Sequence, residues 1–258
     1  SVSFLNILST KRSGHHAFVD WLQDGLGGGS TFANNIVLGR DLGAEIERKL
    51  DRQVLQPGGG LEPGHYLLNF EGVTPRGFDA VQRAQFNLGA AVRTVLFLRD
   101  PLNTLASLLH RKQLPALHIV MLLRQMLALR GWLERHQQGR GGIDLVLYNH
   151  WIASADYRAR IAHRLGLRPV GWIRREARTG SASSFGDLAD FGPAAAPALA
   201  NRWQAYRGDR LFNAILTHPV MAGTFDRMLA GATHDCLGIG ERSDDRLRHF
   251  RAVIADRR

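Results

Sequence analysis

The feature that most constrains this chain is its alternation of strand-like and helix-like segments. Short runs of β-branched and apolar residues, at 4–8 and 92–98 among others, are followed by stretches in which apolar residues recur with helical spacing. This alternation is typical of α/β proteins, in which helices pack on a parallel sheet. We therefore predict a central, mostly parallel sheet with helices on both faces and ligands bound at the carboxyl ends of the strands.

The same patterns place the individual elements along the chain. The expected strands cover residues 4–8, 32–38, 66–70, 92–98 and 143–148. The expected helices cover residues 16–26, 42–50, 78–90, 102–111, 115–137, 155–165, 202–216 and 221–229. A length of 258 residues suits one large domain or two small ones, and we predict a single domain over residues 1–258. Within it we expect a lid or loop region at 171–200 and a polar, basic tail at 232–258.

The charge of the chain permits a polyanionic ligand. The formal net charge is +10, and nearly all of the positive charge is arginine because Lys11, Lys49 and Lys112 are the only lysines. The planar fork of arginine fits a phosphate group with two hydrogen bonds. A basic protein without such a ligand, or a codon bias toward arginine, explains the same composition equally well.

Cysteine content and hydropathy exclude several classes of protein. The one cysteine, Cys236, forms no disulfide within the chain and supplies no thiolate cluster for a metal. The longest apolar stretch, 114–129, contains His118, Arg124 and Gln125 and is too short and too polar for a membrane span. We expect a cytoplasmic protein of bacterial type, without a metal and without a membrane span.

A first phosphate-binding pattern follows the first expected strand. Residues 9–16 read Ser-Thr-Lys-Arg-Ser-Gly-His-His and lead into a helix, whose N-terminal N–H groups suit an anion. Gly14 permits a positive φ and a close approach of the backbone. Lys11 and Arg12 add charge, and Ser13 adds a hydrogen-bond donor. The loop lacks the Gly-Lys-Ser/Thr of a Walker A sequence, and a polar turn with exposed cations is an equal alternative.

A second pattern follows the clearest strand. Arg99 lies at the carboxyl end of 92–98, and Pro101 and Ser107 come after it on an expected helix. Ser107 lies about two turns along this helix, at 3.6 residues per turn. Arg99 and Ser107 are therefore expected to converge on one phosphate group. The alternative is a local ion pair between Arg99 and Asp100, with Ser107 an ordinary helix residue.

Together, and in this order, the two patterns resemble the motifs of sulfotransferases that use 3′-phosphoadenosine 5′-phosphosulfate (PAPS). In that family a Lys or Arg followed by Ser-Gly holds the 5′-phosphosulfate, and Arg-x-Pro with a later Ser holds the 3′-phosphate. Residues 145–148, Leu-Val-Leu-Tyr, resemble the family strand that ends in a tyrosine near the adenine, and residues 183–185, Ser-Ser-Phe, resemble a segment that closes over it. The resemblance covers about residues 4–230.

The resemblance implies a fold like that of nucleotide kinases, and it also implies which reaction the chain catalyses. The reaction is in-line transfer of a sulfuryl group from PAPS to a hydroxyl or amine, which leaves adenosine 3′,5′-bisphosphate (PAP). The acceptor is expected to be a small molecule, a carbohydrate or a lipid, and no nucleic acid is expected as a partner. The residues expected to bind PAPS are Lys11, Arg12, Ser13, Gly14, His15, His16, Arg99, Ser107, Tyr148, Ser183, Ser184 and Phe185.

The reaction also needs charge stabilisation and a general base. Lys11 and Arg12 are the expected source of positive charge, with His15 or His16 as a further donor. Glu71, at the carboxyl end of the expected strand 66–70 and next to Gly72, is the expected base. His65 and His16 are the alternatives, although His65 precedes that strand and is expected at the opposite edge of the sheet.

The chain also departs from the family pattern. His15-His16-Ala17 stand where many members have Thr-Thr-Trp, and Asn149-His150 stand where Glu-Asp often follows the tyrosine. The late Arg-Lys-Gly motif is absent, and 178–180 or Arg202 are candidate substitutes. Three other functions stay open: a nucleotide-dependent kinase, a basic nucleic-acid-binding protein, and a relative that binds nucleotide without catalysis.

Overall fold

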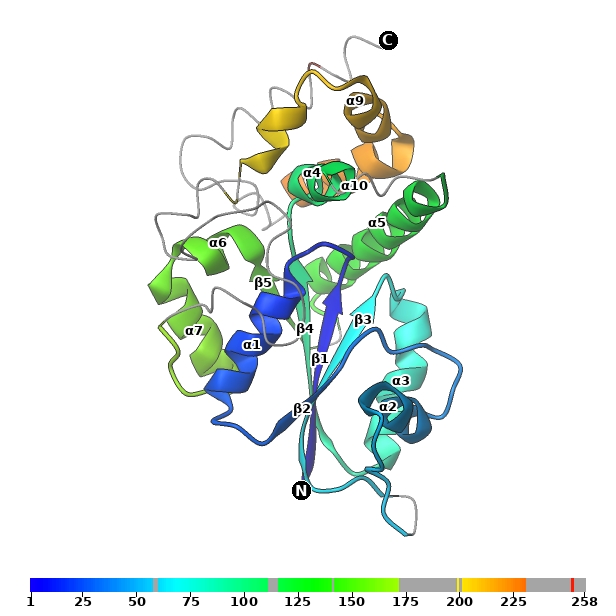
Figure 1. Cartoon of the computed structure of the whole chain (residues 1–258), viewed down its shortest axis with the longest axis vertical. Helices are drawn as coiled ribbons and strands as arrows, with labels where there is room; N and C mark the ends of the chain where they lie inside the picture. Colours follow the sequence, from blue (N-terminus) through cyan, green and yellow to red (C-terminus); the bar gives the residue numbers. More distant parts are fainter. Residues whose placement is uncertain are drawn as a thin grey trace.

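The computed structural model describes residues 1–57, 60–110, 116–140, 142–171 and 201–230, together with positions 199 and 252. In this part of the chain five strands form one sheet (Figure 1), in the order β2-β3-β1-β4-β5, and every neighbouring pair is parallel. The strands are β1 (Val2–Ser9), β2 (Ser30–Ala33), β3 (Gly64–Glu71), β4 (Ala91–Leu98) and β5 (Ile143–Leu147). The predicted α/β fold with a parallel central sheet is confirmed.

The strand order fixes where the sheet offers a ligand site. After β1 the chain adds β2 and β3 on one side of it, and then adds β4 and β5 on the other side. The order therefore reverses beside β1, and the loops that leave β1 and β4 diverge at their carboxyl ends. In open α/β sheets this divergence forms the crevice in which ligands bind.

Helices cover both faces of the sheet, and two apolar clusters result. Successive side chains of a strand point to opposite faces, so Phe4 and Leu8 of β1 join one cluster and Leu5 and Ile7 join the other. The cluster around Leu5 and Ile7 is completed by α1 (His15–Gly25), α6 (Tyr148–Ala153) and α7 (Ala155–Leu165). Because both faces are buried, the strands read as nearly continuous apolar runs.

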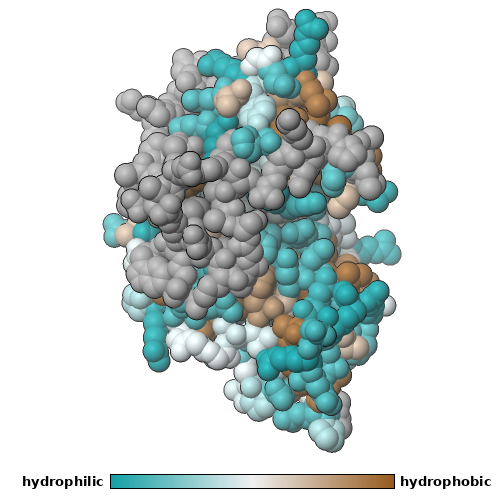
Figure 2. Space-filling view, viewed as in Figure 1, coloured by the Kyte–Doolittle hydropathy of each residue, from teal (hydrophilic) through white to brown (hydrophobic). Residues whose placement is uncertain are grey.

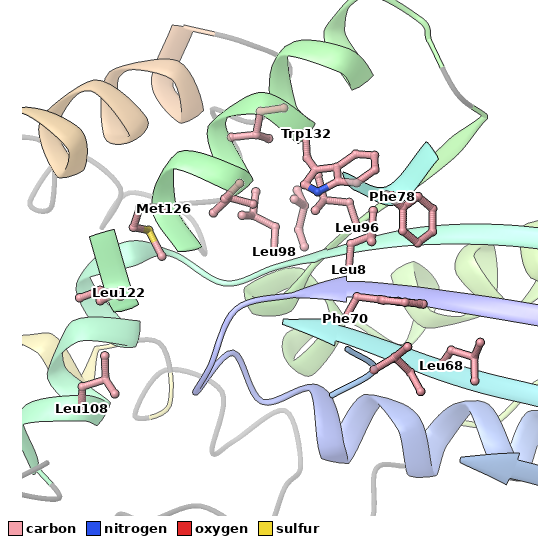
Figure 3. Close-up of a cluster of buried hydrophobic side chains, with 14 of the residues drawn as sticks. Leu8, Leu68, Phe70, Phe78, Leu96, Leu98, Leu108, Leu122, Met126 and Trp132 are labelled. Atoms are coloured by element: carbon pink, nitrogen blue, oxygen red, sulfur yellow. The ribbon is translucent and has the colours of Figure 1, made fainter. Parts of the chain in front are cut away.

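The larger cluster lies on the opposite face. There the strand residues Leu8, Phe70 and Leu96 pack against Phe78 and Trp132 (Figure 3). The helices that contribute to it are α2 (Leu42–Leu50), α3 (Pro75–Asn87), α4 (Pro101–His110), α5 (Ala116–Gln137), α9 (Arg210–Leu216) and α10 (Pro219–Ala230). Figure 2 shows largely hydrophilic residues over α2 and α3, as expected for helices that bury one face only.

Several helices begin at a side chain that accepts a hydrogen bond from the first turn, which satisfies an otherwise unpaired N–H group. The capping residues are Asp41 for α2, Thr74 for α3, Ser154 for α7 and Asp209 for α9. None of the described helices is long and apolar enough to cross a membrane.

Three predicted elements need correction. The strand expected at 32–38 is β2, which ends at Ala33 because only four of its residues pair with β3. The helix expected at 202–216 is a 3₁₀ helix, η1 (Arg202–Tyr206), followed by α9, because Asp209 caps a new helix start. The strand expected at 143–148 ends at Leu147, and Tyr148 begins α6. The expected lid at 171–200 and tail at 232–258 lie outside the described residues, apart from positions 171, 199 and 252.

Candidate active site

The loop from Thr10 to Gly14 joins β1 to α1 and turns sharply. Arg12 and Gly14 have φ angles of 67° and 86°, and the backbone N–H of Ser13 donates to the carbonyl of Thr10 at 3.1 Å. A side chain at position 14 is also excluded by contact, since a Cβ there would lie 2.7 Å from Cε2 of Tyr148. The loop therefore delivers Ser13 and Gly14 to the N-terminus of α1, where backbone N–H groups point outward.

Neighbouring elements hold this loop in place. The backbone N–H of Lys11 donates to Oε1 of Gln125, on α5, at 2.9 Å. The backbone N–H of Gly72 donates to the carbonyl of Ser9 at 3.1 Å, and Oγ of Ser9 donates to Oδ1 of Asn69 at 2.8 Å. Gln125 is 7% exposed, so a buried amide that the sequence patterns did not single out fixes the backbone next to the first phosphate-binding motif.

Arg99 is buried against this loop, and some of its N–H donors have no hydrogen-bond partner in the described chain. Its guanidinium lies 4.7 Å from the ring centre of Tyr148, and Nη1 donates to the backbone carbonyl of Arg12 at 2.9 Å. Nε and Nη2 are buried and have no hydrogen-bond partner within the described chain. Buried polar groups are almost always paired, and a buried cation is costly without a counter-ion. The Arg99 side chain thus has the properties of an anion ligand.

The two predicted motifs meet at Arg12. Ser107 of α4 is 2% exposed, and its Oγ accepts from Nε of Arg12 at 3.3 Å. Arg12 therefore contacts Ser107 through its side chain and Arg99 through its backbone. Asp100, which the sequence left as a possible ion-pair partner of Arg99, caps α4 by accepting from the backbone N–H of Asn103 at 2.9 Å.

A third arginine comes from much later in the chain. Burial lowers the pKa of Arg202, on η1, to about 10; Tyr148 acts in the opposite direction, whereas Arg99 and Arg12 lower the pKa further. Arg12, Arg99 and Arg202 thus gather positive charge at one place, which favours a bound anion. Arg202, a candidate from the sequence, thus lies near Arg99 and Arg12.

Glu71 lies on the other side of the loop. It is the last residue of β3 and pairs with Ser9, the last residue of β1. Its side chain is 16% exposed, and Oε1 lies 3.6 Å from Nε2 of His15. Burial raises the pKa of Glu71, while Lys11 and Lys49 act in the opposite direction. A raised pKa brings a carboxylate closer to the value that suits a general base at neutral pH.

His15 lies between Glu71 and the phosphate loop. It is 3% exposed, and its Nδ1 lies 3.3 Å from Oγ of Ser13. Burial lowers the pKa of His15 to about 3, the neighbouring His16 and Arg12 lower it too, and the Asn34 side chain acts in the opposite direction. The imidazole is therefore neutral at physiological pH, which makes it a hydrogen-bonding group and not a cation. The His16 ring lies 4.3 Å from the His15 ring.

The remaining predicted residues are placed as follows. His65 lies six residues before Glu71 on β3, about 20 Å away at 3.3 Å per residue, and contacts Ser3 at the opposite end of the sheet. Its position there makes it unsuitable as a base for this site. Tyr148 packs over Arg99 and Gly14. Ser183, Ser184 and Phe185 lie outside the described residues, as do 178–180.

The comparisons with known proteins gave a likeness of fold. No protein-family model matches the chain, and no curated protein matches it. Among solved structures, the chain is similar to the crystal structure of the mouse sulfotransferase SULT7A1 complexed with PAP, with a TM-score of 0.44 and 16% sequence identity. The match covers 64% of this chain and 58% of that one, so the chain spans less than two thirds of that protein's length. In the described residues, no three His, Cys, Asp or Glu side chains form a group that could hold a metal ion.

Proposed function

We propose that this chain binds PAPS and transfers its sulfuryl group to a hydroxyl or amine acceptor. The observation that carries the proposal is the double contact of Arg12, which joins the loop after β1 to both Arg99 and Ser107. Two anion-binding motifs that share a residue are close enough for one doubly phosphorylated nucleotide. The orphaned donors of Arg99 fit a phosphate group at this position.

The residues divide between the two ends of the nucleotide. Ser13 and Gly14, at the N-terminus of α1, and the Lys11 side chain would hold the 5′-phosphosulfate. Arg99 and Ser107, with Arg202 as a further cation, would hold the 3′-phosphate. His15, His16 and Tyr148 would complete the binding site, together with Ser183, Ser184 and Phe185 from outside the described residues. We assign these roles to one domain that spans residues 1–258.

The chemistry requires a base and a positively charged environment. Bound PAPS supplies the sulfuryl group. Glu71 would accept the proton of the attacking hydroxyl or amine, and burial, which raises its pKa, favours this role. Lys11 and Arg12 would stabilise the negative charge that develops on the transferring group and the leaving phosphate. Neutral His15 would orient Ser13 through Nδ1, while its Nε2 faces the Glu71 carboxylate at 3.6 Å. The acceptor class is a small molecule, carbohydrate or lipid.

Ligand binding tests this proposal without knowledge of the acceptor. PAP should raise the melting temperature and bind in calorimetry, whereas ATP with Mg²⁺ should do neither to a comparable extent. Arg99→Gln should weaken PAP binding about 10- to 100-fold, as expected for the loss of a charged hydrogen-bonding group. Arg93→Gln is the matched control: it removes the same charge from β4, the strand that leads into Arg99, but Arg93 contacts the backbone carbonyl of Arg164 far from the loop. It should change binding by no more than about twofold.

Two results would contradict the proposal. ATP–Mg²⁺ binding that equals or exceeds PAP binding would favour the kinase alternative. Equal losses of PAP affinity in Arg99→Gln and Arg93→Gln would mean that net charge, and not the buried guanidinium, attracts the nucleotide.

A further inference from the structure

A buried group of hydrogen-bonding residues includes three that directly follow, in the sequence, residues that we assign to the nucleotide site: Arg99, Tyr148 and Arg202. The Asp100 carboxylate accepts from the backbone N–H of Asn103 at 2.9 Å and from its Nδ2 at 2.8 Å. The same carboxylate accepts from Nδ2 of Asn149 at 3.2 Å. Oδ1 of Asn103 accepts from the backbone N–H of Trp203 at 3.1 Å. We call Asp100, Asn103, Asn149 and the Trp203 N–H the Asn103 hub; these four residues are each at most 1% exposed.

The sequence positions of the hub are informative. Asp100 directly follows Arg99, Asn149 directly follows Tyr148, and Trp203 directly follows Arg202. Arg99, Tyr148 and Arg202 lie close to one another at the anion site. The Arg99 guanidinium stacks on the Tyr148 ring, and Arg99 is close enough to Arg202 to lower the pKa of Arg202. The hub joins three separate elements, α4, α6 and η1, at the points where they carry those side chains.

Asn103 is the member that connects η1 to the rest. Its amide donates to Asp100 on one side and accepts from Trp203 on the other, which uses both ends of the side chain. Buried, fully used amides of this kind fix one arrangement of the elements that they join, because any other arrangement leaves a polar group unpaired. The link bridges 100 residues of sequence, so it ties η1 to an element that is distant along the chain.

We infer that Asn103 is a positioning residue that holds η1, and with it Arg202, against the 3′-phosphate end of the site. The inference rests on the proposed function, and it assigns to Asn103 a part in the selectivity for nucleotides that carry a 3′-phosphate, through Arg202. Asn103 itself touches no substrate in this assignment. Loss of its amide should therefore weaken binding of PAP and leave binding of 5′-AMP, which lacks the 3′-phosphate, nearly unchanged.

The experiment measures the ratio of the Kd for 5′-AMP to the Kd for PAP by calorimetry. Asn103→Ala should reduce this ratio about tenfold, as expected for a displaced charged hydrogen-bonding group. Thr104→Val is the matched control, because Thr104 is equally buried on the same turn of α4, and its hydroxyl donates to the backbone carbonyl of Asp100 and not to the hub side chains or to η1. It should leave the ratio within about twofold of the wild-type value.

A double-mutant cycle with Arg202→Gln identifies the route. In the Arg202→Gln background, Asn103→Ala should reduce the ratio much less than it does alone, since both changes remove the same contact. A folded Asn103→Ala protein with the wild-type ratio would overturn the inference, as would a purely structural result in which both nucleotides lose affinity equally. A wild-type ratio close to one would instead overturn the proposed function itself.

A measurement on the unmodified protein covers the case in which Asn103→Ala does not fold. Hydrogen exchange of the backbone over 202–206 should slow more with saturating PAP than with saturating 5′-AMP, because only PAP carries the group that Arg202 would contact. Equal protection by the two nucleotides, in a protein that prefers PAP, would show that η1 takes no part in the selectivity.

Discussion

Glu71 and His15 form a contact that is not an ordinary ion pair. Oε1 of Glu71 lies 3.6 Å from Nε2 of His15, but burial lowers the pKa of His15 to about 3, so the imidazole carries no charge at neutral pH. Burial raises the pKa of Glu71 at the same time. Each side chain is pushed toward its neutral form by the same low-dielectric surroundings. A proton taken up by Glu71 would therefore meet little electrostatic opposition from its neighbour.

Glu71→Gln should lower the turnover of PAPS about 100-fold or more, because the change removes the carboxylate that we propose as the general base. PAP affinity should stay close to the wild-type value. The activity of the wild-type protein should rise with pH as Glu71 loses its proton, above the usual range for a carboxyl group because its pKa is raised. The Glu71→Gln protein should lack this rise. The measurement is PAP release from PAPS, across a pH series, with an acceptor found in a panel of alcohols and amines.

Glu62→Gln supplies the control, since Glu62 precedes β3 at the far end of the sheet. A Glu71→Gln protein with turnover within a few-fold of wild type, and with an unchanged pH profile, would exclude Glu71 as the base.

At the scale of elements, the loop after β1 is determined by more than its own sequence. Gly14 takes a φ of 86° because the N-terminus of α1 must start there, and the Tyr148 ring, from the start of α6, fills the space where a Cβ would lie. Gln125 of α5 holds the other end of the loop at Lys11. The loop is thus shaped by helices that follow β4 and β5, more than 100 residues away in the sequence.

Gly14→Ala and Gly28→Ala separate the cost of a left-handed backbone from the cost of contact with Tyr148. Both glycines have similar positive φ angles, 86° and 88°, but nothing lies within 4 Å of a Cβ at position 28. Each change should cost about 1–2 kcal/mol of unfolding free energy for the left-handed backbone. Gly14→Ala should cost a further 1–3 kcal/mol, roughly, for overpacking against Tyr148. Urea denaturation measures both values, and equal losses would show that Tyr148 does not confine the loop.

Much of the fold and part of the site could be predicted from the sequence. The strands could be found because burial on both faces makes them continuous apolar runs. Arg99 and Ser107 could be expected near one another because helical geometry relates them locally, and the structure joins each of them to Arg12. Arg202 was only a candidate, and Gln125 and Asn103 were not assigned a role. Gln125 contacts Lys11 across 114 residues, and Asn103 contacts Trp203 across 100. Contacts at such separations leave no local pattern, although a glutamine within the apolar stretch 114–129 is a signal that could have been followed.

At the scale of the whole molecule, the buried site ties folding stability to pH. The pKa of His15 falls from 6.5 to about 3 on folding, so between these values the unfolded chain binds a proton that the folded chain does not. This contribution to stability is fully present above pH 6.5 and is lost as the pH falls. The slope that it adds is at most about 1.4 kcal/mol per pH unit. Glu71, with its raised pKa, acts in the opposite direction.

A comparison of variants isolates the histidine. His15→Asn should show a smaller loss of unfolding free energy between pH 6.5 and 4 than the wild-type protein. His163→Asn, at an exposed position on α7, should follow the wild-type slope. The measurement is chemical denaturation at a series of pH values, and parallel slopes for all three proteins would contradict the burial of a neutral His15.

The central position of β1 also has a consequence for how the chain acquires its structure. β1 pairs with β3 and β4, which begin at Gly64 and Ala91 and are therefore made by the ribosome long after it. Until then, this largely apolar strand has both of its edges open, and such edges promote aggregation. Sheet assembly thus waits for the nascent chain to lengthen, and this interval is when a chaperone would protect it most.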